Sequence, residues 1–171
     1  MANAVQFARV LAPRIGASES QVAFGAERLR RAGMIRTRGH GTPVNLDDYE
    51  IALVILVALL GAPAGNSPDH VAAYAGLTDI DGTTLTELLA RLLAHPHRLV
   101  RLQIDIGAPH AFVAVEGDGA VNAHAFGDPG TTPRLAIVDG DTFTAIATAI
   151  RALPEKRSGR PATKQRFEIH T

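Results

Sequence analysis

The sequence has no cysteine and no long hydrophobic run, and these absences exclude several classes of protein. Without cysteine, the chain forms neither disulfide bonds nor thiolate metal sites. The longest apolar run, residues 51–60, has ten residues and is too short to span a bilayer. The first residues lack the basic and then apolar order of a secretion signal, so we expect a cytoplasmic protein with no membrane contact.

The sequence motifs of several enzymes are also missing. No serine lies in a nucleophile-elbow sequence, and there is no GxGxxG motif or phosphate-binding loop. The seven histidines are scattered, and only His95 and His97 lie close together, with no carboxylate at ligand spacing. Asp139 and Asp141 are typical of a strand end and a helix cap. We therefore expect no enzyme activity, no metal site and no cofactor.

The formal net charge of zero conceals an uneven distribution of charge. Residues 1–46 hold seven arginines and two glutamates, a net charge of +5. Residues 47–150 hold four arginines against thirteen acids, which gives −9, and residues 151–171 hold six basic residues against two acids, which gives +4. Basic ends around an acidic middle indicate contact with a polyanion. Solvated arginines scattered over helix surfaces are the simpler alternative.

Hydrophobic periodicity and capping residues predict the secondary structure. Helices are expected over residues 4–15, 18–32, 48–60, 67–75, 84–94 and 141–153. Alternating apolar residues predict strands over 98–106, 110–116, 120–126 and 135–138, and a glycine-cornered hairpin over 34–38 and 42–46. Ser18 and Gln21 are spaced as a capping box, whereas Pro13 puts the last turn of the first helix in doubt.

Residues near the N-terminus have the spacing of a helix-turn-helix. Ala12, Gly16 and Val22, at gaps of four and six, supply a small residue at the helix crossing, a turn glycine and an apolar residue that seals the pair. Leu29 continues the buried stripe. The following run, residues 29–35, resembles the end of the recognition helix and the wing of winged helix-turn-helix regulators. The resemblance covers about forty residues, from 8 to 46.

This resemblance implies that the chain binds double-stranded DNA. The recognition helix enters the major groove by its N-terminal end, where Gln21 can pair with adenine and Phe24 can contact a thymine methyl. Phe24 could instead be a core aromatic residue. Helix arginines would hold phosphates, and basic residues of the wing would contact the flanking backbone or minor groove. The expected DNA-binding residues are Ser20, Gln21, Phe24, Arg28, Arg31, Arg36, Arg38 and His40.

The predicted elements indicate an α+β fold in three parts. Residues 1–62 form a winged helix-turn-helix domain, and central helices follow it. Residues 63–153 form an association or partner-binding domain, with an antiparallel β-meander and a closing helix. Residues 154–171 are expected to be a flexible basic tail. The Gly-Arg-Pro sequence around Arg160 is similar to an AT-hook, but a nonspecific electrostatic arm explains it better, and a solubilising terminus better still.

Three functions are compatible with this organisation. The first is a sequence-specific transcriptional regulator, such as a repressor, acting as a homodimer or a larger ring, because one winged helix makes few base contacts. The second is a phage-type small terminase subunit, which recognises DNA for genome packaging, although the long coiled helices of those proteins are absent here. The third is an inhibitor or adaptor from a mobile element, which would bind a protein partner through its acidic region 63–153.

Overall fold

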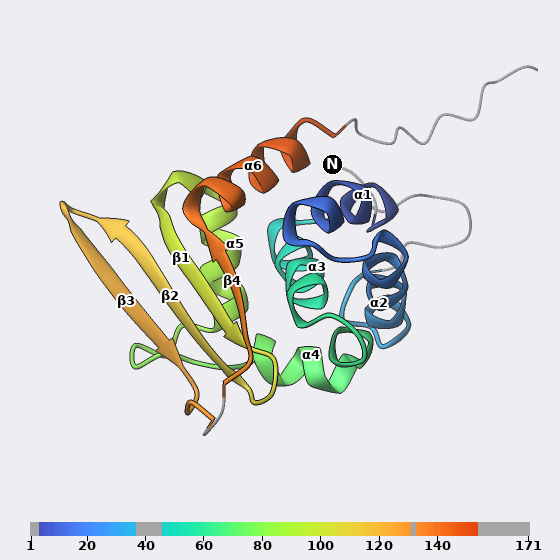
Figure 1. The fold of residues 1–171 in the computed structure, drawn as a ribbon, viewed down its shortest axis with the longest axis horizontal. Coiled ribbons are helices and arrows are strands. Elements are labelled where there is room, and N and C mark those ends of the chain that lie inside the picture. The colour runs from blue at the N-terminus through green and yellow to red at the C-terminus, as the bar shows by residue number, and fades with distance from the viewer. Residues whose placement is uncertain (1–3, 37–45, 131–132, 154–171) are drawn as a thin grey trace, which may run out of the picture.

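A computed structural model describes residues 4–36, 46–130 and 133–153, which are drawn in colour in Figure 1. In these residues helices come first, and an antiparallel sheet with a closing helix follows, so the predicted α+β class is confirmed. The α-helices are α1 (Ala4–Ile15), α2 (Glu19–Arg31), α3 (Asp48–Leu60), α4 (Pro68–Ala75), α5 (Leu85–Ala94) and α6 (Gly140–Arg151). The strands are β1 (Leu99–Asp105), β2 (His110–Gly117), β3 (Ala120–Phe126) and β4 (Leu135–Asp139). Two 3₁₀ turns, η1 (Ala64–Asn66) and η2 (Pro96–Arg98), join helices to their neighbours.

The N-terminal helices pack around α3, which is apolar on every side. Its residues from Glu50 to Leu60 are all buried, because α1, α2, α4 and α5 surround it. The helix starts at a capping box in which the Asp47 side chain accepts from the Glu50 amide and the Glu50 side chain accepts from the Asp47 amide. At thirteen residues it is an interior helix, and no helix of the described residues has the length and apolarity to cross a membrane.

The sheet has the strand order β3-β2-β1-β4, and every pairing in it is antiparallel. Its inner face carries the buried side chains Leu102, Ile104, Val113 and Val138, which join the hydrophobic core. Figure 1 places α5 and α6 between this sheet and the N-terminal helices. The closing helix α6 packs against β1 and β4 and also against α1. One continuous cluster of buried residues therefore runs from α1 and α2 to the sheet.

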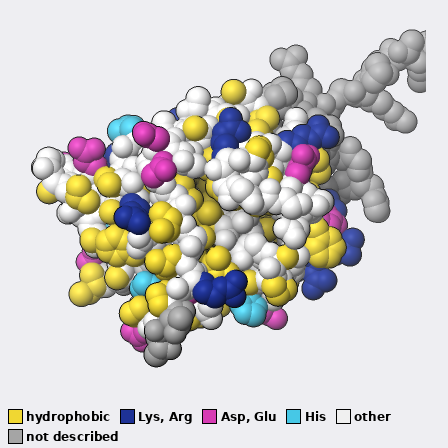
Figure 2. Space-filling model, viewed as in Figure 1, with side chains coloured by type: hydrophobic (Ala, Val, Ile, Leu, Met, Phe, Trp, Pro, Cys, Tyr) yellow, Lys and Arg dark blue, Asp and Glu magenta, His cyan; other side chains and the backbone are white. Residues whose placement is uncertain are grey.

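The outer face of the sheet is not covered by a described helix or strand. The strand register shows which side chains share this face. They are Arg101 and Gln103 from β1, Phe112, Ala114 and Glu116 from β2, Val121, Ala123 and Ala125 from β3, and Leu135 and Ile137 from β4. Three of its large apolar side chains, Val121, Leu135 and Ile137, are 60%, 44% and 50% exposed. The space-filling view shows hydrophobic side chains over the sheet (Figure 2).

Several local expectations differ from the structure. The predicted meander holds for β1, β2 and β3, but β4 returns to pair with β1 on the far side of the sheet. The helix α1 continues through Pro13 to Ile15. Ser18 is the N-cap residue of α2, but its side chain makes no capping hydrogen bond. Its hydroxyl instead lies 2.8 Å from that of Ser20, so the predicted capping box with Gln21 is wrong.

The predicted strand over residues 34–38 is not formed in its described part. The Met34 amide instead closes the end of α2 with a 3.0 Å hydrogen bond to the Leu29 carbonyl. The Arg36 amide donates to the Glu50 carboxylate at 2.7 Å, so neither amide is available for a strand partner. The remainder of the predicted hairpin, residues 37–45, lies outside the described residues.

Candidate nucleic-acid interface

A three-residue turn joins α1 to α2. Gly16 begins this turn with a φ of +68°, a left-handed conformation that favours glycine. The Ala17 amide then donates to the Ala12 carbonyl at 2.9 Å, which closes the last turn of α1. The sequence prediction that Gly16 turns the chain between two helices is thus consistent with this backbone.

The two helices face each other through the residues expected to seal them. Ala12 and Val22 are each 1% exposed, and Leu29 is fully buried. On the same buried side of α2, Gly25 lies close to α3 and η1. A Cβ atom at Gly25 would lie 2.4 Å from the Val57 side chain and 2.8 Å from the Gly65 carbonyl oxygen. A glycine here lets α2 pack directly on the interior helix, which fixes the direction of its opposite face.

That opposite face carries the predicted DNA-binding residues of α2. Ser20, Gln21, Phe24, Arg28 and Arg31 are all exposed, and their spacing places them along one side of the helix. Phe24 is 53% exposed, so it is not a core aromatic residue. The ring of Phe24 is therefore accessible to a ligand of this face, beside the polar and cationic side chains.

The charged side chains of this face differ in how strongly they are held. The Arg28 guanidinium lies 6.0 Å from the centre of the Phe24 ring, in a cation–π contact. Arg30 and Arg31 both bind Glu27, at 2.5 Å and 3.1 Å. The hydrogen bond from Arg30, followed by that from Arg31, lowers the pKa of Glu27 below its usual value. Arg28 therefore offers its charge more freely than its two neighbours do.

Arg36 has a structural role that the sequence did not suggest. Its guanidinium binds the carboxylates of Glu50, at 3.0 Å, and of Asp47. Burial alone would raise the pKa of Glu50, but the side-chain and backbone hydrogen bonds from Arg36 and the Asp47 amide lower it. The same carboxylates raise the pKa of Arg36, with the hydrogen bond to Glu50 as the main cause. Arg36 thus fastens the segment after α2 to the start of α3, and its guanidinium is already occupied.

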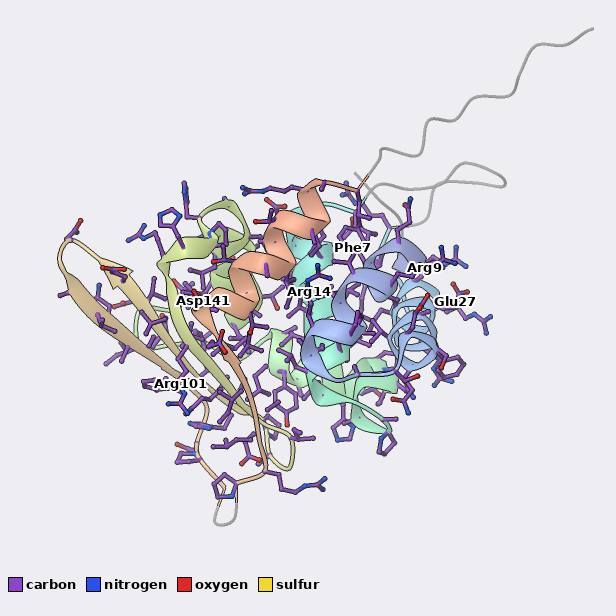
Figure 3. The ribbon with its side chains drawn as sticks, turned by 45° about the horizontal axis from the view of Figure 1, so that its top comes forward. Phe7, Arg9, Arg14, Glu27, Arg101 and Asp141 are labelled. Carbon is purple, nitrogen blue, oxygen red and sulfur yellow. The ribbon has the colours of Figure 1, made fainter. Side chains whose placement is uncertain are left out.

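Two further predicted residues, Arg38 and His40, lie outside the described residues. Two exposed arginines that the sequence did not single out are Arg30, on α2 itself, and Arg9, on the neighbouring α1. Arg9 binds Glu19 at 3.0 Å and joins α1 to the first turn of α2. Figure 3 shows Arg9 and Glu27 at one end of the molecule and Arg101 on the sheet at the other. The ion pairs of Glu27 with Arg30 and Arg31 could have been predicted, because these residues are three and four positions apart on one helix.

A second polar cluster lies beside β3, and the sequence analysis missed it. The His124 ring nitrogen Nδ1 lies 2.9 Å from an oxygen of Asp79, whose side chain is only 2% exposed. Burial raises the pKa of Asp79, but hydrogen bonds from His124 and from the Thr83 and Asp81 amides lower it overall. The two residues are 45 positions apart, so no local spacing could have indicated the pair.

In the described part of the chain, no group of three or more His, Asp or Glu side chains is arranged to hold a metal ion. The cluster instead fixes the loop that carries Asp79 against the inner side of β3.

The comparisons with known proteins give no match: no protein-family model matches the chain, and neither a curated protein nor a solved structure does. The candidate interface therefore depends on the geometry of α1 and α2 alone.

Proposed function

We propose that this chain binds double-stranded DNA through the exposed face of α2 and acts as a sequence-specific transcriptional regulator. The observation that carries the proposal is the division of α2 into two sides. Val22, Gly25 and Leu29 are buried against α1, α3 and η1, while Gln21 and Arg28 project outward. A helix held in this way can enter a major groove without disturbing the core.

The electrostatics of the helix support the same orientation. Figure 2 shows arginine side chains along the side of the molecule where α2 lies. The acids of this helix, Glu19 and Glu27, each bind arginine, which leaves Arg28 with no described carboxylate partner. Phosphate contacts by Arg28 and Arg31 would supply affinity, and Gln21 and Phe24 are the side chains able to read base edges.

The decisive measurement is binding of the double variant Arg28→Ala/Arg31→Ala to a fluorescent duplex taken from the DNA upstream of its own gene. We expect affinity to fall by roughly tenfold or more and the salt dependence of log K to flatten by about one unit per lost phosphate contact. Both side chains are exposed, so circular dichroism and the thermal midpoint should stay close to those of the wild-type chain.

A matched control removes two exposed arginines elsewhere in the chain. Arg91→Ala/Arg134→Ala loses the same charge but leaves α2 intact, so its affinity should stay within about threefold of wild type and its salt slope should be unchanged. Equal losses in both double variants would show that binding depends on overall charge alone and would refute the role of α2. Absence of binding by the wild-type chain to any duplex would refute the function itself.

A further inference from the structure

The strand β3 forms one edge of the sheet, and in the described part of the chain no other strand pairs with its outer side. The other edge, β4, has only five residues, is preceded closely by Pro133 and runs directly into α6. By contrast, β3 has seven residues with no proline and no charged side chain. Its pairing with β2 continues from Ala120 to Phe126 without a bulge. Proteins usually block such an edge with charge, proline or a bulge, because its free backbone groups pair with another strand.

A groove follows the open side of this strand. The groove has a volume of about 570 Å³ and is lined by residues 122–125 of β3 and by Asp79, Ile80 and Asp81 of the loop between α4 and α5. Successive residues of a strand point to opposite faces, so a hollow lined by four in a row lies along the strand edge. The bond between His124 and Asp79 holds the loop beside it, and Ile80 in that loop is completely exposed.

The side chains of β3 are complementary to a second copy of the same strand. Ala123 is the central residue, so antiparallel pairing about that position places it opposite itself. Val121 then lies opposite Ala125, and Asn122 lies opposite His124. Apolar residues thus meet apolar residues on the outer face, and an amide meets an imidazole on the inner face. The two strands carry no charged side chain, so no like charges face each other between them. The exposed carboxylate of Asp81 lies in the loop beside the groove, to one side of the paired strands.

We propose that two copies of this chain pair through β3 in antiparallel orientation about a two-fold axis near Ala123. The result is one continuous sheet of twice four strands, with Ile80 of each copy covered near the junction. Because both copies use the same edge in a two-fold contact, the assembly closes at two and forms no ring. The inference does not depend on DNA binding, since it follows from the sheet alone.

The absence of cysteine makes a direct test possible, because an introduced thiol is the only one in the chain. In Ala123→Cys, the two thiols face each other across the axis, where Cα atoms of paired antiparallel residues lie about 4.5–5.5 Å apart, within disulfide range. Mild oxidation should convert most of this variant to a covalent dimer. The matched control Ile137→Cys places an exposed thiol on the same face at the other edge, and it should cross-link roughly tenfold less.

Sedimentation gives an independent readout without oxidation. The wild-type chain should sediment at twice its mass of 18.0 kDa, and Ala123→Lys should sediment as a monomer with unchanged circular dichroism. Ile137→Lys should remain dimeric. A monomeric wild-type chain, a dimer that Ala123→Lys leaves intact, or equal cross-linking of both cysteine variants would overturn the pairing. A monomeric chain that binds an extended peptide at its β3 edge would also overturn the pairing.

These outcomes are separable from those of the DNA experiment. The arginine variants of α2 should remain dimeric, and Ala123→Lys should keep the contacts of each α2 with DNA while losing the avidity of two linked sites. A dimer that binds no duplex would refute the regulator and leave the β3 pairing standing.

Discussion

Among the described residues, no helix or strand covers the exposed face of α2 or the outer part of the sheet around β3, but the chemistry of the two surfaces is opposite. The α2 face is polar and carries Arg28 and Arg31, whereas β3 has no charged residue and exposes Val121 and alanines. Charge favours a surface that meets a solvated polyanion, and its absence favours a surface that meets another strand. The proposed DNA contact and the proposed strand pairing therefore use separate parts of the chain and do not compete.

The two regions nevertheless depend on one core. The inner side of α2 and the inner face of the sheet belong to the same cluster of buried residues. The predicted division at residues 62–63 into separate domains stays a prediction, but the contacts of α1 with α6 and of α3 with α5 join both sides of it. Five further variants, in three experiments, test how far the exposed surfaces are independent of this core.

The largest effect is expected from Leu29→Ala, which removes a fully buried side chain from the inner face of α2. Loss of packing and the remaining cavity should lower the free energy of unfolding by about 2–5 kcal/mol, as measured by urea denaturation. The matched variant Phe24→Ala removes a larger side chain from the exposed face of the same helix and should change stability by only about 0.5 kcal/mol. Comparable losses in both would contradict the two-sided description of α2.

A smaller effect concerns Glu50, the buried carboxylate that binds Arg36. Since its pKa is lowered in the folded chain, it stabilises the fold above its unfolded pKa of about 4.3 and loses this contribution as pH falls through the folded value. Glu50→Gln should therefore lower the thermal midpoint at pH 7, and its midpoint should fall less steeply than that of the wild type between pH 5 and pH 3.

Asp79 and Asp105 also have lowered pKa values, so part of the acid sensitivity should remain in this variant. The two amides of Gly107 and Arg134 that donate to Asp105 are the main cause of its shift. A wild-type midpoint that stays constant down to pH 3 would contradict the assignment for all three carboxylates.

The smallest effect distinguishes the first turns of two helices. Thr84 accepts from the Glu87 amide at the start of α5, and Thr84→Ala should cost about 1 kcal/mol in urea denaturation. Ser18 makes no such bond at the start of α2, so Ser18→Ala should cost roughly 0.5 kcal/mol or less. An equal cost for both substitutions would show that Ser18 caps α2 in solution.

Much of the fold could be predicted because the determining signals are local. The alternation of Val100, Leu102 and Ile104 with polar residues predicted β1, and capping residues such as Asp47 predicted the helix starts. Local signals could not predict which strand pairs with β4. Nothing in residues 135–139 indicates whether they pair with β3 or β1; the choice depends on packing of α6 against β1 and β4.

The candidate interface divides in the same way. The exposed face of α2 follows from helical spacing around Val22 and Leu29, so its residues could be named from the sequence. Arg36 was assigned to a DNA contact because its carboxylate partners begin eleven positions later, at the cap of another helix. The groove beside β3 depends on a loop brought in by His124 and Asp79, and contacts of that separation leave no periodic trace in a sequence.

The packing of α6 on α1 has a mechanical consequence for a dimer. This packing joins the sheet to the N-terminal helices through side chains in close contact. Two chains paired at β3 would therefore hold their α2 helices at a fixed separation. A dimer of this kind would select DNA by the spacing of two half-sites as well as by their base sequence. Its two half-sites would need a constant spacing, because an insertion of about five base pairs turns one half-site to the opposite side of the helix.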